Sequence, residues 1–67
     1  MLKYELTVTT ANGTFSVSDN LPTIMQNASE YTEWLGADLE FMQIMNLQTG
    51  EVLAAWRHDP TYGLTAV

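Results

Sequence analysis

The chain has 67 residues, enough for one domain, and a domain of this size buries only about 60% of the surface that its unfolded form exposes. It contains no cysteine and one histidine, which excludes disulfides, most zinc sites and a conventional histidine-based metal site, so we expect no cofactor. Eight acidic against two basic residues give a formal net charge of −6, which argues against direct binding to nucleic acid or to anionic membrane lipids.

The first part of the chain predicts a β-hairpin. Apolar residues alternate with polar ones from Leu2 to Val8, which is the period-two pattern of a half-buried strand. Ala11-Asn12-Gly13 indicates a turn, because Asn and Gly accept positive φ at little cost. Phe15 and Val17 then continue an inward face on a second strand.

A helix is predicted over residues 21–35. Asp19 and Asn20 offer N-cap oxygens, and Pro22 suits the first turn, where no amide hydrogen is needed. Gly36 is a natural left-handed terminator, and Trp34 should lie half exposed beside the apolar stripe. That stripe consists of Leu21, Ile24, Met25, Ala28, Tyr31 and Leu35.

Residues 39–57 predict a second hairpin with apolar side chains on both faces. The run Gln48-Thr49-Gly50-Glu51 indicates a turn closed by a left-handed glycine. If Asn46 lies opposite Val52, one face carries Met42, Ile44, Val52, Ala54 and Trp56. The other face carries Phe41, Met45, Leu53 and Ala55, with Gln43 and with Arg57 at its margin. We expect the helix on the Trp56 face, because Trp56 is large, so that the second face stays open.

These elements predict an α+β fold of order ββαββ, in which one helix packs across one face of a four-stranded antiparallel sheet. A single domain is expected over residues 1–58, with the strand order left open. Residues 59–67 are expected to form a tail, either disordered or packed on the sheet, since Pro60 and Gly63 argue against regular structure.

Two alternatives would remove the open apolar face. A twist or bulge near Phe41 and Met42 would bring both apolar sets into one core. The tail, through Tyr62 and Leu64, would cover the face if it folded back across it. Sequence alone leaves both alternatives open beside the two-sided hairpin.

Residues suited to catalysis are sparse, and we expect no enzyme activity. His58 and Asp59 are adjacent, so in extended backbone their side chains diverge instead of forming a base and its orienting acid. Asp38 and Glu40 lack the loop of alternating oxygens that calcium requires, and no metal site is expected. A membrane-spanning run and a signal-peptide core are also missing from the sequence, which favours a cytoplasmic protein.

The sequence therefore predicts a small acidic binding module that self-associates through Phe41, Met45, Leu53, Ala55 and Arg57 and engages a protein partner. Its negative charge favours a basic partner. The alternative hypothesis is an inhibitor of the kind found among small phage proteins, which occupies the basic nucleic-acid site of a target. Its carboxylates would then imitate phosphates, and the candidate acidic surface consists of Glu30, Glu33, Asp38 and Glu40.

Overall fold

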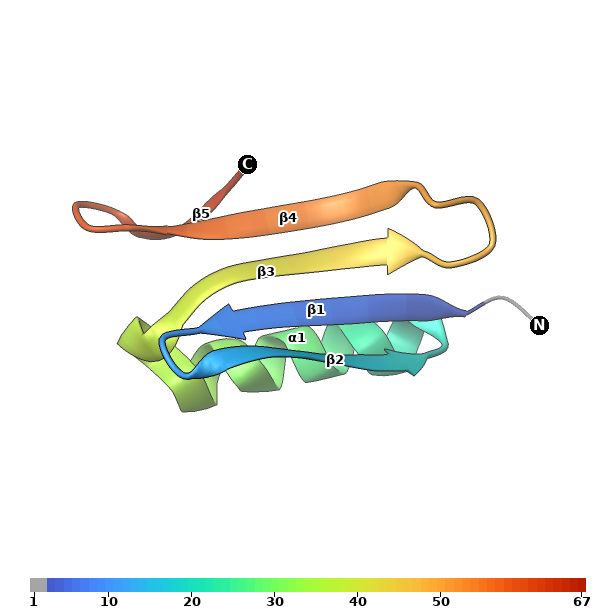
Figure 1. The fold of residues 1–67 in the computed structure, drawn as a ribbon, viewed down its shortest axis with the longest axis horizontal. Helices are drawn as coiled ribbons and strands as arrows, with labels where there is room; N and C mark the ends of the chain where they lie inside the picture. The colour runs from blue at the N-terminus through green and yellow to red at the C-terminus, as the bar shows by residue number, and fades with distance from the viewer. Residues whose placement is uncertain (1–2) are drawn as a thin grey trace.

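The computed structural model describes residues 3–67, so Leu2, which begins the predicted alternation, lies outside the described residues. Within that range one helix follows the first two of five strands (Figure 1). The elements are β1 (Tyr4–Thr10), β2 (Gly13–Asp19), α1 (Leu21–Leu35), a short 3-10 turn η1 (Gly36–Asp38), β3 (Leu39–Asn46), β4 (Val52–Asp59) and β5 (Gly63–Ala66).

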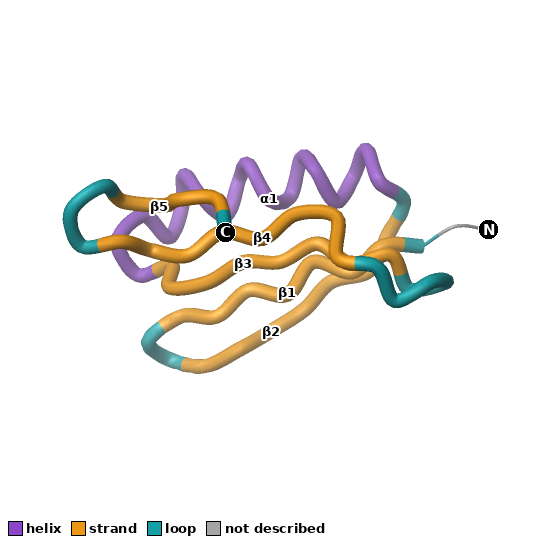
Figure 2. The backbone as a smooth tube through the Cα atoms, turned by 90° about the horizontal axis from the view of Figure 1, so that it is seen from above, coloured by secondary structure: helices purple, strands orange, loops and turns teal. Residues whose placement is uncertain are grey.

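All strand pairs are antiparallel, and the sheet has the order β2-β1-β3-β4-β5. The helix lies on one side of this sheet and packs against β1, β2 and β3 (Figure 2). The α+β class with one helix and an antiparallel sheet is confirmed. The expected four-stranded ββαββ arrangement is wrong in its strand number, because residues 63–66 add a fifth strand at one edge.

The first hairpin is confirmed, with Leu6 opposite Val17 and Val8 opposite Phe15. Thr10 pairs with Gly13, so a two-residue turn joins the strands. Positive φ falls at Gly13, with a value of 140°, and not at Asn12. Glycine alone therefore supplies the unusual backbone conformation at this turn.

The predicted helix bounds are confirmed at both ends. Asn20 is the N-cap, and its side-chain oxygen accepts a hydrogen bond from the Thr23 amide at 3.1 Å. At the other end Gly36 takes a φ of 51° and donates its N–H to the carbonyl of Thr32. Trp34 is 69% exposed, more than expected, with its ring edge-on to Tyr31 at 5.8 Å.

The expectation that residues 59–67 lack regular structure is wrong, because β5 lies within them. The Asp59 carboxylate accepts hydrogen bonds from the amides of Thr61 at 2.7 Å and Tyr62 at 3.1 Å, and Gly63 takes a φ of 80°. Asp, Pro and Gly at these positions make a tight turn that returns the chain to pair with β4. Pro60 and Gly63 thus mark a reversal between two strands and not the end of regular structure.

The core lies between α1 and the strands β1 and β3. Its buried residues are Leu6, Val8, Ile24, Ala28, Leu39, Met42 and Ile44. A ring of half-buried residues surrounds it, namely Tyr4, Val17, Leu21, Tyr31, Leu35, Trp56 and Leu64. None of the buried residues comes from β4 (Val52–Asp59), although β4 is hydrogen-bonded to strands on both of its edges.

Candidate protein-contact site

The second hairpin follows the predicted register along most of its length. Met42 lies opposite Trp56 and Ile44 opposite Ala54, as the pairing of Asn46 with Val52 requires. A bulge then shifts the register, and Val52 pairs with Met45 instead. The expectation that Val52 lies under the helix is therefore wrong, because the bulge turns it to the opposite face, where it is 47% exposed.

The face of the sheet away from α1 carries a group of apolar residues that we call the open-face patch. It consists of Phe41, Met45, Val52, Leu53 and Ala55. Because Met42 and Ile44 are buried beneath the helix, their neighbours Phe41 and Met45 point to the other side of the sheet. Leu53 is 45% exposed, while Phe41, Met45 and Ala55 are half-buried by their neighbours on the sheet.

Polar residues border the open-face patch on the β1–β2 side. The hydroxyl oxygens of Thr9 and Thr14 lie 3.3 Å apart across the hairpin, and the Thr7 hydroxyl donates to the Glu5 carboxylate at 3.4 Å. The same face of β2 also carries Ser16 and Ser18, so the apolar area ends at β3. Polar side chains therefore line the open-face patch along the β1–β2 side.

Neither of the two alternatives that would hide the patch is realised. Leu64 packs against the core from the helix side, and Tyr62 is 81% exposed, so the tail does not cover the open face. Phe41 and Met45 stay outside the buried cluster despite the bulges in β1–β3 and β3–β4. Arg57 is exposed and lies opposite Phe41, at the margin that the sequence predicted.

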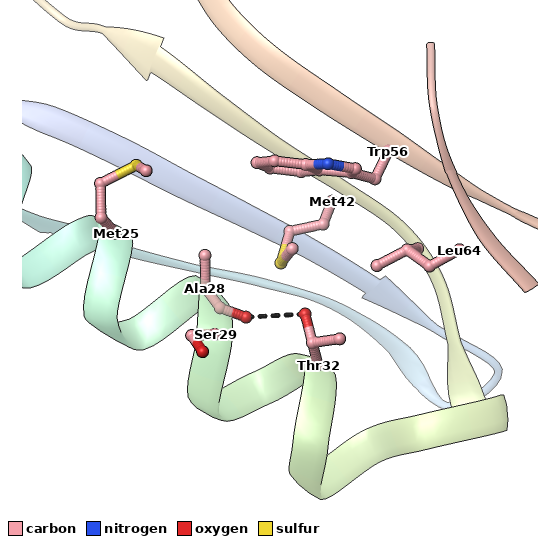
Figure 3. Close-up of a pocket in the computed structure, with 7 residues that line it drawn as sticks. All are labelled: Met25, Ala28, Ser29, Thr32, Met42, Trp56 and Leu64. Atoms are coloured by element: carbon pink, nitrogen blue, oxygen red, sulfur yellow. Dashed lines mark hydrogen bonds between the residues drawn. The ribbon is translucent and has the colours of Figure 1, made fainter.

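A second apolar surface, which we call the side groove, lies on the helix side of the sheet (Figure 3). Its volume is about 400 Å³. The helix contributes Met25, Ala28, Ser29 and Thr32, and the sheet contributes Met42, Trp56 and Leu64. A neighbouring hollow of about 310 Å³ shares Thr32 and Leu64 with it and continues towards Gly36 and His58.

Sequence reasoning missed the side groove because it placed Trp56 beneath the helix. Trp56 is half-buried and lies beside α1, since the helix packs mainly against β1, β2 and β3. The signal that was available is Leu64, an apolar residue in a segment that was not expected to be a strand. With β5 recognised, Leu64 falls next to Trp56 on the helix side of a sheet too wide for one helix.

The four residues of the predicted acidic surface come from consecutive elements. Glu30 accepts a hydrogen bond from Gln26 at 3.3 Å, and Glu33 lies exposed near the end of α1. Asp38 belongs to η1, and Glu40 is the extra residue where the β1–β3 register shifts. The last turn of α1 contains no basic residue, so these carboxylates add to the negative end of the helix dipole.

The adjacent pair His58 and Asp59 does not form a base with its orienting acid. His58 lies half-buried opposite Leu64 in β4. Asp59 uses a carboxylate oxygen to accept the two turn amides described above, which holds it in the β4–β5 turn. Among residues 3–67, no cluster of three or more His, Cys, Asp or Glu side chains is placed to hold a metal ion.

Comparisons with protein-family models, curated proteins and solved structures gave no match for this chain. Within the described part of the chain, α1 is too short and too polar to cross a membrane. The function of the protein is therefore inferred from its own residues. The open-face patch and the side groove, which lie on opposite sides of the sheet at β4, are the two surfaces from which we infer it.

Proposed function

We propose that this protein is a small acidic, non-catalytic binding module that self-associates through the open-face patch. The proposal rests on the burial of β4. This strand pairs with β3 and β5, yet none of its residues Val52–Asp59 is buried. An internal strand of an antiparallel sheet normally has at least one face packed on a core. On the open side Val52 and Leu53 stay 47% and 45% exposed, and a second copy of the chain would cover them.

The charges on the open face favour a second copy as the covering molecule. Near the patch this face carries Glu5, opposite Met45, Arg57, opposite Phe41, and the exposed Glu40, which directly precedes Phe41. Both signs of charge are therefore present here, although the chain carries a net charge of −6. Two copies that meet here therefore experience less like-charge repulsion than their other surfaces would create.

The geometry is that of two sheets stacked face to face about a two-fold axis, with the helices on the outside. Burial of about 600 Å² of apolar surface per dimer would contribute on the order of 15 kcal/mol before the costs of association. Much of this is offset by lost rigid-body and side-chain freedom, so the affinity of the dimer has to be measured.

Sedimentation velocity over protein concentrations from about 1 µM to about 1 mM tests the proposal. The wild-type chain is expected to pass from monomer to dimer in this range. Leu53→Asp places a charge at the centre of the patch and should leave the protein monomeric over the whole range, with an unchanged circular dichroism spectrum.

The matched control is Ser16→Asp, which adds the same charge to the same face of the sheet but outside the open-face patch. It should dimerise as the wild-type chain does. A wild-type chain that stays monomeric at the highest concentration, or a Leu53→Asp variant that dimerises equally well, contradicts the proposal.

The arrangement of carboxylates favours a second candidate, an acidic inhibitor of a basic nucleic-acid-binding site. Glu30, Glu33 and Asp38 follow one another towards the negative end of α1, where a cation would be the stabilising choice. Their combined potential would attract a surface that normally binds phosphates.

Neutralising these carboxylates tests that candidate with an oligolysine peptide as the probe. The triple variant Glu30→Gln, Glu33→Gln, Asp38→Asn should weaken binding at low salt by about tenfold, as the loss of three attractive charges implies. The matched control, Glu5→Gln, Asp19→Asn, Glu51→Gln, removes the same charge elsewhere and should weaken it by less than about threefold. Equal losses of affinity in both triple variants would mean that the attraction comes from the net charge of the whole protein. That result rules out a localised phosphate mimic.

A further inference from the structure

We propose that the side groove binds an amphipathic helix of a partner protein, and that the polar face of this partner helix is basic. The side groove and the open-face patch lie on opposite sides of the sheet. The proposal is therefore independent of self-association, and a dimer formed through the open face would leave both of its side grooves accessible.

The width of the sheet leaves room for one more helix. Five strands spaced about 4.8 Å apart span about 19 Å between the outer strands, whereas an α-helix with its side chains is about 10 Å across. On the β2 side of α1 the space is filled, because Phe15 and Tyr31 pack edge to face at 5.2 Å. On the other side nothing among the described residues lies over Trp56 and Leu64 except the flank of α1 (Figure 3).

The wall that α1 presents to the side groove permits close approach of a second helix. Met25, Ser29, Thr32 and Gly36 recur at intervals of four, three and four residues, which places them on one line along the helix. Beyond Met25 these residues are small, which suits the interaxial distance of about 8–10 Å found between packed helices. The line is about 16 Å long at 1.5 Å per residue, which corresponds to three turns of a bound helix.

The chemistry of the side groove favours an apolar face on the bound helix. Trp56, Met42 and Leu64 form the floor, and tryptophan and methionine are enriched at the centres of protein interfaces. The Thr32 hydroxyl donates to the Ala28 carbonyl at 2.8 Å, so this polar group of the wall already has a partner. Such a groove accepts apolar anchors spaced three and four residues apart on a helix.

The charged residues around the side groove favour a basic polar face on the bound helix. Glu33 lies one helical turn beyond Ser29 on the outer rim, and Asp38 follows the end of the wall. Neither basic residue of the chain lies at the rim, since Arg57 is on the open face and Lys3 precedes β1. Lysine or arginine beside the apolar anchors would therefore be attracted to the rim, and glutamate would be repelled.

A second copy of this chain is a poor occupant of the side groove. The only α-helix that it offers within residues 3–67 is α1, whose outer side carries the exposed Gln26 and Glu33 and the half-buried Glu30. Insertion of that helix would bring carboxylates against the carboxylates of the rim, a repulsive arrangement. The favoured occupant is thus a different protein.

Selection from displayed helical peptides tests the proposal with the intact chain. Two libraries of 16-residue peptides share randomised apolar positions at i, i+3, i+4 and i+7, and they differ only in whether the polar positions are Lys and Arg or Glu. The basic library is expected to give binders, and the acidic library is not. The binders should shift the NMR signals of the Trp56 indole N–H and of the Met25 and Met42 methyl groups.

Two substitutions then locate the site. Leu64→Glu changes the floor of the side groove and should weaken the selected peptides at least tenfold, whereas Leu53→Glu changes the open-face patch and should alter their affinity less than twofold. Failure of both libraries, enrichment of acidic peptides, or binding that is sensitive to Leu53→Glu and not to Leu64→Glu overturns the proposal. None of these outcomes bears on dimerisation, which sedimentation measures separately.

Discussion

Replacing Ile24 by alanine is expected to remove most of the stability of the protein. Ile24 has an exposed fraction of 0% and stands at the centre of the contact between α1 and the sheet. Truncation of a fully buried isoleucine costs about 2–5 kcal/mol, from lost burial and from the cavity that remains. A domain of this length has a total stability of only about 3–5 kcal/mol, so this single change removes most of it.

Met25→Ala is the matched control, because Met25 occupies the next position of the same helix and is 54% exposed. This variant should lower the free energy of unfolding by less than about 1 kcal/mol. Urea denaturation followed by circular dichroism compares the two variants at equal protein concentration. If their unfolding midpoints coincide, the core does not lie where the structure places it.

The melting temperature is expected to rise with protein concentration, by about 5–10 °C for a hundredfold increase. When folding and dimerisation are coupled, mass action favours the dimer by about 2.7 kcal/mol for each hundredfold rise in concentration. This contribution is large beside the stability that the thin core supplies, because only seven residues of the described chain are buried hydrophobics.

Leu53→Asp should abolish this dependence on concentration and should melt at a lower temperature than the wild-type chain, since its open-face patch stays in water. Ser16→Asp should keep the dependence, because Ser16 lies on the polar part of the same face. Differential scanning calorimetry at several concentrations measures both. A wild-type melting temperature that is the same at every concentration would show that the fold does not rely on association.

Local signals in the sequence were sufficient for the first hairpin and for the helix. The N-cap Asn20 and the terminator Gly36 act within a few residues of themselves, and each makes the hydrogen bond that its residue type predicts. The register of the second hairpin followed from Gly50, which takes a φ of 77° and donates its amide to Asn46. Short-range rules succeed here because the interactions that they describe are short-range.

The fifth strand was missed because Pro60 and Gly63 are compatible with two different local structures. Both residues end regular structure, and both also build the tight turn of a hairpin. The difference lies in whether the following segment finds a pairing partner, here the free edge of β4. Whether a free strand edge is available depends on the tertiary structure, so the local sequence could not predict the fifth strand.

The open-face patch was predicted with one error, the placement of Val52. Alternation along a strand assigns each side chain to a face, and a single bulge reverses the assignment for every residue beyond it. The bulge at Leu53 moves Val52 from the helix side to the open face, which enlarges the patch. The side groove could not be predicted at all, since it depends on the width of the sheet and therefore on β5.

Contacts between labelled and unlabelled chains test self-association through the open face most directly. In a mixed sample of isotope-labelled and unlabelled protein, filtered NMR spectra record only the nuclear Overhauser effects that cross between two chains. We predict such effects at the methyl groups of Met45, Val52 and Leu53, which belong to the open-face patch. Their absence at a concentration of about 1 mM, or their appearance only at residues outside the patch, would contradict the proposed role of this surface.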